Sequence, residues 1–203
     1  MPRRYADLFS EIPEHRFRFD TSSSESRARG GPSHFVGFSG LAVSSAEAWQ
    51  TPLGSVPIDR PVIERLIAGK LVDMLDAAHA REHSLEVQIP FLQTAVGQFS
   101  LVPIVAGDSP PEAVAALLDA VWGGPETLIV ISTDLSHYLD YRMCQATDRR
   151  TADAIERFDA NALGPDSACG RVPLGGLLVA ARRRGMTIAR LDMRNSGDTD
   201  GPQ

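Results

Sequence analysis

An aspartate and a histidine three positions apart are the first candidates for chemistry in this sequence. Asp134 and His137 stand in the run STDLSHY, residues 132–138. A carboxylate placed one turn from a histidine can orient the imidazole as a base, an acid or a metal ligand. The spacing equally fits a plainer interpretation, in which Asp134 caps the next helix and His137 is a solvated surface residue. The spacing alone leaves both interpretations open.

A second polar group occupies residues 79–86, with the sequence HAREHSLE. If this segment is helical, His79 and His83 share one face, and so do Glu82 and Glu86. Histidines four residues apart have the geometry of a zinc-binding helix. The metalloprotease signature HExxH is absent, however, because Glu82 precedes His83. A charged, solvated helix face is therefore the favoured interpretation of this group.

Two further candidates are single residues that precede expected elements. His34 closes the run GPSH, and a lone histidine in a loop is usually solvated. Cys169 stands just ahead of an expected helix, where the pKa of a thiol can fall and the sulfur can bind a metal. A single cysteine is more often a small buried apolar residue. Neither residue identifies a site by itself.

Apolar runs alternating with helical segments must position these groups. We expect strands at 41–43, 99–105, 128–131 and 187–191. We expect helices at 59–68, 84–92, 110–124, 144–158 and 174–184. This alternation predicts βαβ units in an α/β fold, a three-layer sandwich with a mainly parallel central sheet. The run 128–131 (LIVI) leads directly into Asp134 and His137, which places both at the carboxyl end of a strand, where ligands gather.

Composition limits the function classes. The chain has 203 residues, a formal net charge of −6 and 43% hydrophobic residues, which weakens any case for nucleic-acid binding. No run approaches the roughly 20 apolar residues of a membrane span. Two cysteines are too few for a disulfide framework, so a reducing, cytoplasmic location is expected. No GxGxxG, GxxxxGK[ST] or GxSxG motif occurs. Residues 1–30 are polar and slightly basic, an atypical segment ahead of a domain at 31–203.

Several blocks, in this order, resemble the Memo family, known in bacteria as AmmeMemoRadiSam system protein B. The matching blocks are GPSH (31–34), SGLAVSSAEAWQTPLGSVPIDR (39–60), EHSLEVQIPFLQ (82–93), LVPIVAG (101–107), STDLSHY (132–138), ACGRVPLGGLL (168–178) and NSGD (195–198). The resemblance implies a three-layer α/β sandwich similar to the extradiol dioxygenases that use non-haem iron. It also implies, as partners, a radical SAM protein and an AMMECR-type protein of the same system.

The resemblance further implies a metal site of two histidines and a cysteine. One histidine belongs to a PHAGY block, the second maps to His34, and the cysteine maps to Cys169. His83, Asp134 and His137 fall in motifs that line the same cleft; His83 or His137 is the expected acid/base, with Asp134 orienting His137. Nitrogen and sulfur donors with open positions suit Fe(II) or copper.

The sequence departs from this family at both ends. No PHAGY block occurs, residues 1–30 stand in its place, and the strand expected after NSGD is missing. We therefore expect a domain that is incomplete at both ends, with metal binding weakened by the missing histidine. The expected function is that of a metal-binding protein with a dioxygenase-like cleft of unassigned reaction, acting on an unknown small molecule or peptide. The alternative is a non-catalytic module that binds a peptide or protein in the same cleft.

Overall fold

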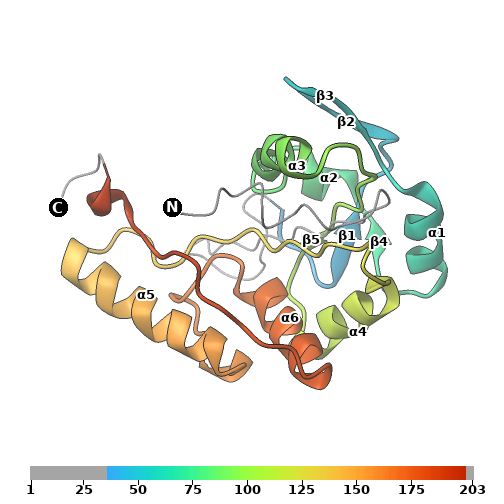
Figure 1. Cartoon of the computed structure of the whole chain (residues 1–203). Coiled ribbons are helices and arrows are strands. Elements are labelled where there is room, and N and C mark those ends of the chain that lie inside the picture. The colour runs from blue at the N-terminus through green and yellow to red at the C-terminus, as the bar shows by residue number, and fades with distance from the viewer. Residues whose placement is uncertain (1–35, 200–203) are drawn as a thin grey trace.

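The computed structural model describes residues 36–199, which form short strands, mostly in the first half, and α-helices (Figure 1). The strands are β1 (Leu41–Val43), β2 (Ala48–Thr51), β3 (Gly54–Pro57), β4 (Asp73–Met74) and β5 (Val105–Ala106). The helices are α1 (Arg60–Ala68), α2 (Asp76–His79), α3 (Ile89–Val96), α4 (Pro111–Val121), α5 (Tyr141–Glu156) and α6 (Arg171–Arg183). Short 3₁₀ turns are η2 (Glu86–Gln88), η3 (Ala160–Ala162) and η4 (Ser196–Asp198). His34 and the segment 1–30 lie outside the described residues.

The strands form two small sheets. In the first, β1 lies between β4 and β5, parallel to β4 and antiparallel to β5, with Ala42 opposite Asp73 on one side and Val105 on the other. All of β1 is buried, as its apolar sequence predicts for a central strand. In the second sheet, β2 and β3 form an antiparallel hairpin that turns at Gly54, whose φ is +115°. The α/β class is confirmed, but a mainly parallel sheet in a three-layer sandwich is not.

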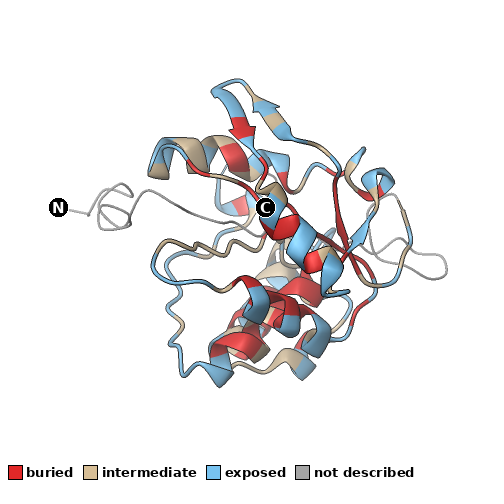
Figure 2. Cartoon of the chain, turned by 90° about the vertical axis from the view of Figure 1, so that its right-hand side faces the viewer, coloured by how far each residue is buried: buried red, intermediate tan, exposed pale blue. Residues whose placement is uncertain are grey.

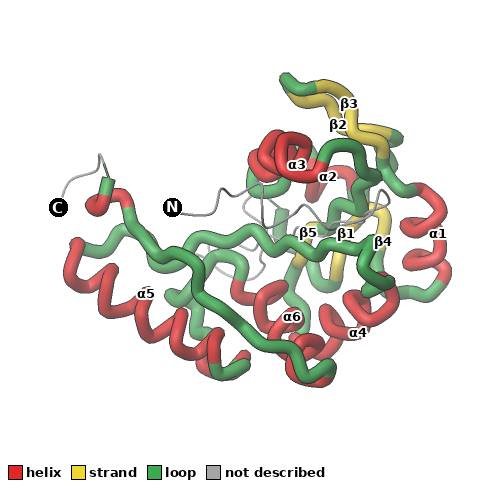
Figure 3. Tube along the Cα trace, viewed as in Figure 1, coloured by secondary structure: helices red, strands yellow, loops and turns green. Residues whose placement is uncertain are grey.

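Two expected strands are wrong for the described part of the chain. Residues 128–131 and 187–191 are not strands and run as long loops in Figure 3. Neither segment pairs with a described strand. The run 99–105 is a strand only at its end, in β5, with one further bridge between Leu101 and Ile58. Hydrophobic runs predict burial, whereas a strand also needs a neighbour to bond.

The expected helices are present, with shifted ends. Helix α1 begins after Asp59, whose carboxylate accepts from the Val62 N–H at 3.1 Å. Helix α5 begins earlier than expected because Asp140 caps it by accepting from the Met143 N–H at 3.0 Å. The segment 84–92 is divided into η2 and α3, since Pro90 is tolerated only in the first turn of a helix.

The main core lies between α4, α6 and the first sheet. Buried side chains from α1, β1, α4 and α6 form one cluster, and Figure 2 shows buried residues on the helices and along the central strands. Helix α6 approaches α4 closely at Gly176, where an added Cβ would overlap the Val114 side chain. This packing fixes the start of α6, and with it the position of Cys169. Within residues 36–199, no helix is both long and apolar enough to cross a bilayer.

Candidate metal centre

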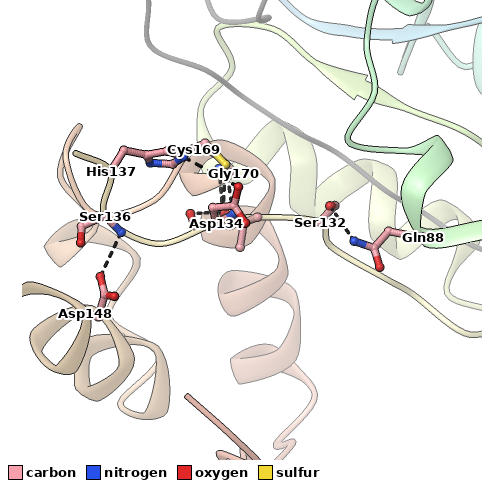
Figure 4. Close-up of polar contacts among 9 residues, drawn as sticks. Gln88, Ser132, Asp134, Ser136, His137, Asp148, Cys169 and Gly170 are labelled. Atoms are coloured by element: carbon pink, nitrogen blue, oxygen red, sulfur yellow. Dashed lines mark hydrogen bonds and ion pairs between the residues drawn. The ribbon is translucent and has the colours of Figure 1, made fainter. Parts of the chain in front are cut away.

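Three potential metal ligands from two distant segments meet in front of α6. The side chains of Asp134, His137 and Cys169 each offer one ligand atom, and these atoms all lie within 4.8 Å of one another. Asp134 and His137 come from the loop before α5, and Cys169 from the turn before α6 (Figure 4). The structure therefore brings together the expected Asp134–His137 pair and the expected cysteine.

Two hydrogen bonds hold Cys169 against Asp134, each with a backbone N–H as the donor. The Asp134 N–H donates to the Cys169 Sγ at 3.1 Å, and the Cys169 N–H donates to the Asp134 carbonyl oxygen at 3.1 Å. The Thr133 Oγ1 lies 3.6 Å from the same sulfur. These contacts fix the position of the sulfur beside Asp134.

Thr133 and Gly170 also take part in the contact between these two segments. The Gly170 N–H donates to the Thr133 Oγ1 at 2.8 Å, and the Thr133 hydroxyl donates to the Asp134 carbonyl oxygen at 2.9 Å. The two backbones are so close that a Cβ at position 170 would lie 2.6 Å from the Thr133 Cβ and 2.8 Å from the Ser132 carbonyl oxygen. Only glycine fits there without a shift, which explains the glycine after the cysteine in the run CGR.

The side chains of Asp134 and His137 are exposed, and Cys169 is half-buried. The Asp134 side chain is 86% exposed and that of His137 42% exposed. The His137 Nε2 lies 3.8 Å from the Asp134 Oδ2, which is too long for a hydrogen bond but within ion-pair range if the ring is protonated. Tyr138, fully exposed and in a left-handed conformation (φ 58°), places its ring 5.9 Å from that of His137. Open coordination positions are therefore available on the solvent side.

A buried carboxylate on α5 anchors the loop that carries His137. Asp148 accepts from the Ser136 N–H at 2.9 Å and from the Cys144 thiol at 3.3 Å. Asp148 is buried, whereas its partners are half-buried. Sequence reasoning missed both Asp148 and Thr133. A polar residue on the inner side of an otherwise amphipathic helix was the only signal for Asp148.

His83, an expected acid/base, lies outside the cluster of Asp134, His137 and Cys169. Its Nδ1 pairs with the Glu86 carboxylate at 2.7 Å, and both side chains are exposed. The block 82–93 instead reaches the site through Gln88, whose amide donates to the Ser132 Oγ at 3.1 Å (Figure 4). The condition under which His79 and His83 would share one helix face is not met, because α2 ends at His79.

His79 is enclosed elsewhere, against β1. Its Nε2 lies 3.2 Å from the Ala42 carbonyl oxygen, and its ring meets that of Trp49 edge-on. Burial lowers the pKa of His79, against the opposing effects of the Ala42 carbonyl and the Asp76 carboxylate. The half-buried His79 ring thus packs against β1 and Trp49, which the interpretation of residues 79–86 as a solvated helix face did not predict.

The donor chemistry of the cluster suits a transition metal. One thiolate, one imidazole and one carboxylate offer sulfur, nitrogen and oxygen, and sulfur–nitrogen sets bind copper, iron or zinc. Alkaline-earth ions prefer oxygen alone and are not favoured here. His34 lies outside the described residues, so its relation to the cluster stays a prediction.

Comparisons with known proteins agree with the motifs. The sequence matches the family described as Memo-like protein over residues 29–203. A MEMO1 family protein of Methanosarcina acetivorans is 33% identical over 184 residues, covering 84% of this chain and 68% of the relative. Similar proteins of the same description occur in Saccharolobus solfataricus (32% identical; 85% of this chain, 66% of the relative) and Methanococcoides burtonii (35%; 84% and 69%). The chain thus spans about two thirds of the length of these relatives.

Proposed function

This chain belongs to the Memo family, and from that premise we propose that Asp134, His137 and Cys169 hold one transition-metal ion. One observation carries the proposal: ligand atoms of three different kinds lie within 4.8 Å of one another, although they come from segments that are far apart in sequence. Exposed acidic groups often gather without a metal, but here a backbone N–H also holds a thiol within 4.8 Å of a carboxylate oxygen and an imidazole nitrogen. The donor set favours Fe(II) or copper over harder ions.

The residues of the chain would prepare the site before a metal arrives. The Asp134 N–H donates to the Cys169 sulfur and so holds it within 4.8 Å of the ligand atoms of Asp134 and His137. Asp148 and Gly170 keep the two loops in place. A bound Fe(II) or copper ion would supply Lewis-acid or redox chemistry at this cluster.

The open side of the cluster is where a substrate would approach. The exposed Asp134 carboxylate can accept a proton or a hydrogen bond from a ligand, and His137 beside it can be oriented as an acid or base when it is not a metal ligand. In that second arrangement, His34 and Cys169 hold the metal, as the family resemblance implies. A dioxygenase-like reaction stays part of this proposal as an analogy of fold.

The test is a metal titration of the full chain, stripped with a chelator and kept anaerobic. Fe(II), Cu(I) and Zn(II) are titrated against a competing chromophoric chelator, and Co(II) reports thiolate coordination by its charge-transfer band. We expect one ion per chain and a loss of about 100-fold or more in Cys169→Ala, by comparison with the 10–100-fold that outer residues contribute. Cys144→Ser is the matched control and should bind normally, because a serine hydroxyl can still donate to Asp148 as the Cys144 thiol does.

The variants also separate the two arrangements. If His137 is a ligand, His137→Ala weakens binding as Cys169→Ala does; if His34 is the ligand, only His34→Ala and Cys169→Ala weaken it. Binding that is unchanged in Cys169→Ala, or no binding by the wild-type chain, would overturn the proposal.

A second candidate function is a non-catalytic module that binds a peptide beside the same cluster. Large exposed apolar side chains favour it: Tyr138, Leu139 and Met143 lie at the loop before α5 and in its first turn. Exposed aromatic and apolar residues are typical of protein contacts. The radical SAM and AMMECR-type proteins implied by the family are the partners we propose to test first. Both described cysteines are free, which suits the proposed cytoplasmic location.

A further inference from the structure

A hollow lies apart from the metal centre, between the β2–β3 hairpin and the segment that runs from α2 to α3 (Figure 1). Its volume is about 700 Å³, which is within the range of sites that take small molecules. Ser44 and residues 48–52 line one side, and residues from the segment 76–90 line the other. No member of the metal cluster lines it, so the hollow is a separate candidate for binding.

Trp49 gives the hollow an aromatic wall whose position is fixed. Its half-buried side chain packs against three separate clusters of the core, so the ring is held in place before any ligand arrives. Val87 of η2, an exposed apolar residue, lines the hollow from the other segment. Trp49 and Val87 therefore form an apolar part of the lining that an alkyl chain can cover.

The polar part of the lining includes Asp76, whose carboxylate is held in one orientation. Its Oδ1 accepts from the Ser44 hydroxyl at 2.8 Å and from the Ser45 N–H at 2.7 Å, and its Oδ2 accepts from the Ser45 hydroxyl at 2.7 Å. These bonds, first that from the Ser45 N–H, lower the pKa of Asp76 to about 2, so the carboxylate is negative at neutral pH. Because a carboxylate has about four acceptor positions, these three bonds leave one on Oδ2 for a further donor.

The charge of the lining is negative. Glu82 and Glu86 line the hollow as further carboxylates, and none of the described residues that line it is lysine or arginine. Arg60 donates to the Ser44 carbonyl oxygen at 2.9 Å but is not one of the lining residues. A lining of this charge attracts a cation and repels an anion.

His79 adds a nitrogen acceptor to the same lining. Its Nε2 lies 3.2 Å from the Ala42 carbonyl oxygen, which places the proton on Nε2 and makes Nδ1 the acceptor. Burial lowers the pKa of His79, which favours this neutral form of the ring. Among the described residues, the buried Nδ1 has no hydrogen-bond partner. Buried polar atoms are normally paired, and a donor group of a bound molecule would satisfy this one.

The lining thus combines acceptors, negative charge and an apolar wall, which together select the ligand. Among the described residues, the only three side chains whose ligand atoms lie close enough for one metal ion are those of the metal cluster, so the hollow is better suited to an organic cation. We propose that the hollow binds a small aliphatic amine, with its ammonium group at Asp76 and its alkyl chain along Trp49 and Val87. An ammonium group carries three donors and no acceptor, as this lining requires.

A series of ligands with one alkyl chain and different head groups tests this proposal. Hexylamine, hexanol and hexanoate are titrated into the full chain by calorimetry, with fluorescence of the Trp122→Phe variant reporting Trp49, the other tryptophan of the sequence. We expect one hexylamine per chain and a change in Trp49 fluorescence. Hexanol should bind at least tenfold more weakly, because it lacks the charge, and hexanoate should not bind.

Three results of this series would overturn the proposal. The first is that hexylamine does not bind, and the second is that hexanol or hexanoate binds as tightly as hexylamine. The third is that lysine with both its α-amino and carboxyl groups blocked by amides binds where hexylamine does not, which would make the occupant a polypeptide side chain.

Variants place the amine in the hollow. Asp76→Asn keeps the shape of the side chain and removes its charge, so hexylamine should bind about tenfold more weakly or less. Glu86→Gln, at an exposed lining residue, should weaken binding about two- to fivefold. The matched control is Glu64→Gln on the exposed side of α1, which makes the same charge change outside the hollow and should bind normally. Cys169→Ala should also bind hexylamine as the wild type does, which separates this site from the metal centre.

Asp76→Asn can also alter the fold because Ser44 and Ser45 donate to Asp76, so its circular dichroism is compared first. If that variant is misfolded, Glu86→Gln and the ligand series decide. Hexylamine binding that is the same in Glu86→Gln as in Glu64→Gln, and the same in a folded Asp76→Asn, would show that the amine does not occupy this hollow.

Discussion

Replacing Gly170 by alanine should damage the metal centre through a backbone clash. The added Cβ would lie 2.6 Å from the Thr133 Cβ and 2.8 Å from the Ser132 carbonyl oxygen, whereas ordinary contacts begin at 3.4 Å. The φ of Gly170 is −86°, which alanine adopts freely, so the effect is one of space and not of conformation. The two loops must separate by several tenths of an ångström, since neither the Ser132 backbone nor a Cβ can turn aside.

The expected cost is that of overpacking, about 1–3 kcal/mol, which corresponds to a fall in melting temperature of roughly 2–12 °C for a chain of this size. The separation also lengthens the contact between the Asp134 N–H and the Cys169 sulfur, so metal affinity should fall by about tenfold, in the range of outer-residue effects. Thermal unfolding followed by circular dichroism measures the first effect, and the Co(II) titration measures the second.

The control is Gly164→Ala in the same connection between α5 and α6. A Cβ at this position would meet only the Ser167 Oγ, at 3.9 Å. We expect the free energy of unfolding of this variant to lie within about 0.5 kcal/mol of that of the wild type. It should also bind metal normally. If Gly170→Ala were as stable as Gly164→Ala and bound metal equally well, the close contact between the two loops would not exist as described.

Three other predictions concern ionisable side chains. Asp148→Ala should leave the Ser136 N–H without its acceptor, which lowers the free energy of unfolding by about 1–3 kcal/mol and weakens metal binding. Asp148→Asn should lose less stability and less metal affinity. Thermal unfolding and the metal titration measure the two effects. Burial lowers the pKa of His79, so the wild type loses stability as pH falls below the ordinary value of 6.5; His79→Gln should lose this slope when melting temperatures at pH 7.5 and 5.5 are compared. Hydrogen bonds, first from the Ser45 backbone, lower the pKa of Asp76 to about 2, so its contribution is present above pH 3.8 and lost as pH falls toward 2; Asp76→Asn should flatten acid unfolding in that range.

The helices and the core could largely be predicted from the sequence because their signals are local. Asp59 before an apolar period of 3.6 residues predicts the start of α1, and the prolines at 110 and 111 predict the start of α4. The family motifs placed Cys169, His83 and the Asp134–His137 pair in one cleft. The structure brings together the ligand atoms of Asp134, His137 and Cys169, whereas His83 pairs with Glu86 outside that cluster.

The sheet could not be predicted in the same way because strand pairing is not local. The run 128–131 has the composition of a central strand, but its pairing depends on a neighbour that no residue of that run specifies. The side chains of a motif are likewise hard to place from the sequence. His83 belongs to a specific motif, yet its ring pairs with Glu86, and Gln88 of the same motif contacts Ser132. Which member of a motif reaches a site depends on where the helix is broken, here by Pro90.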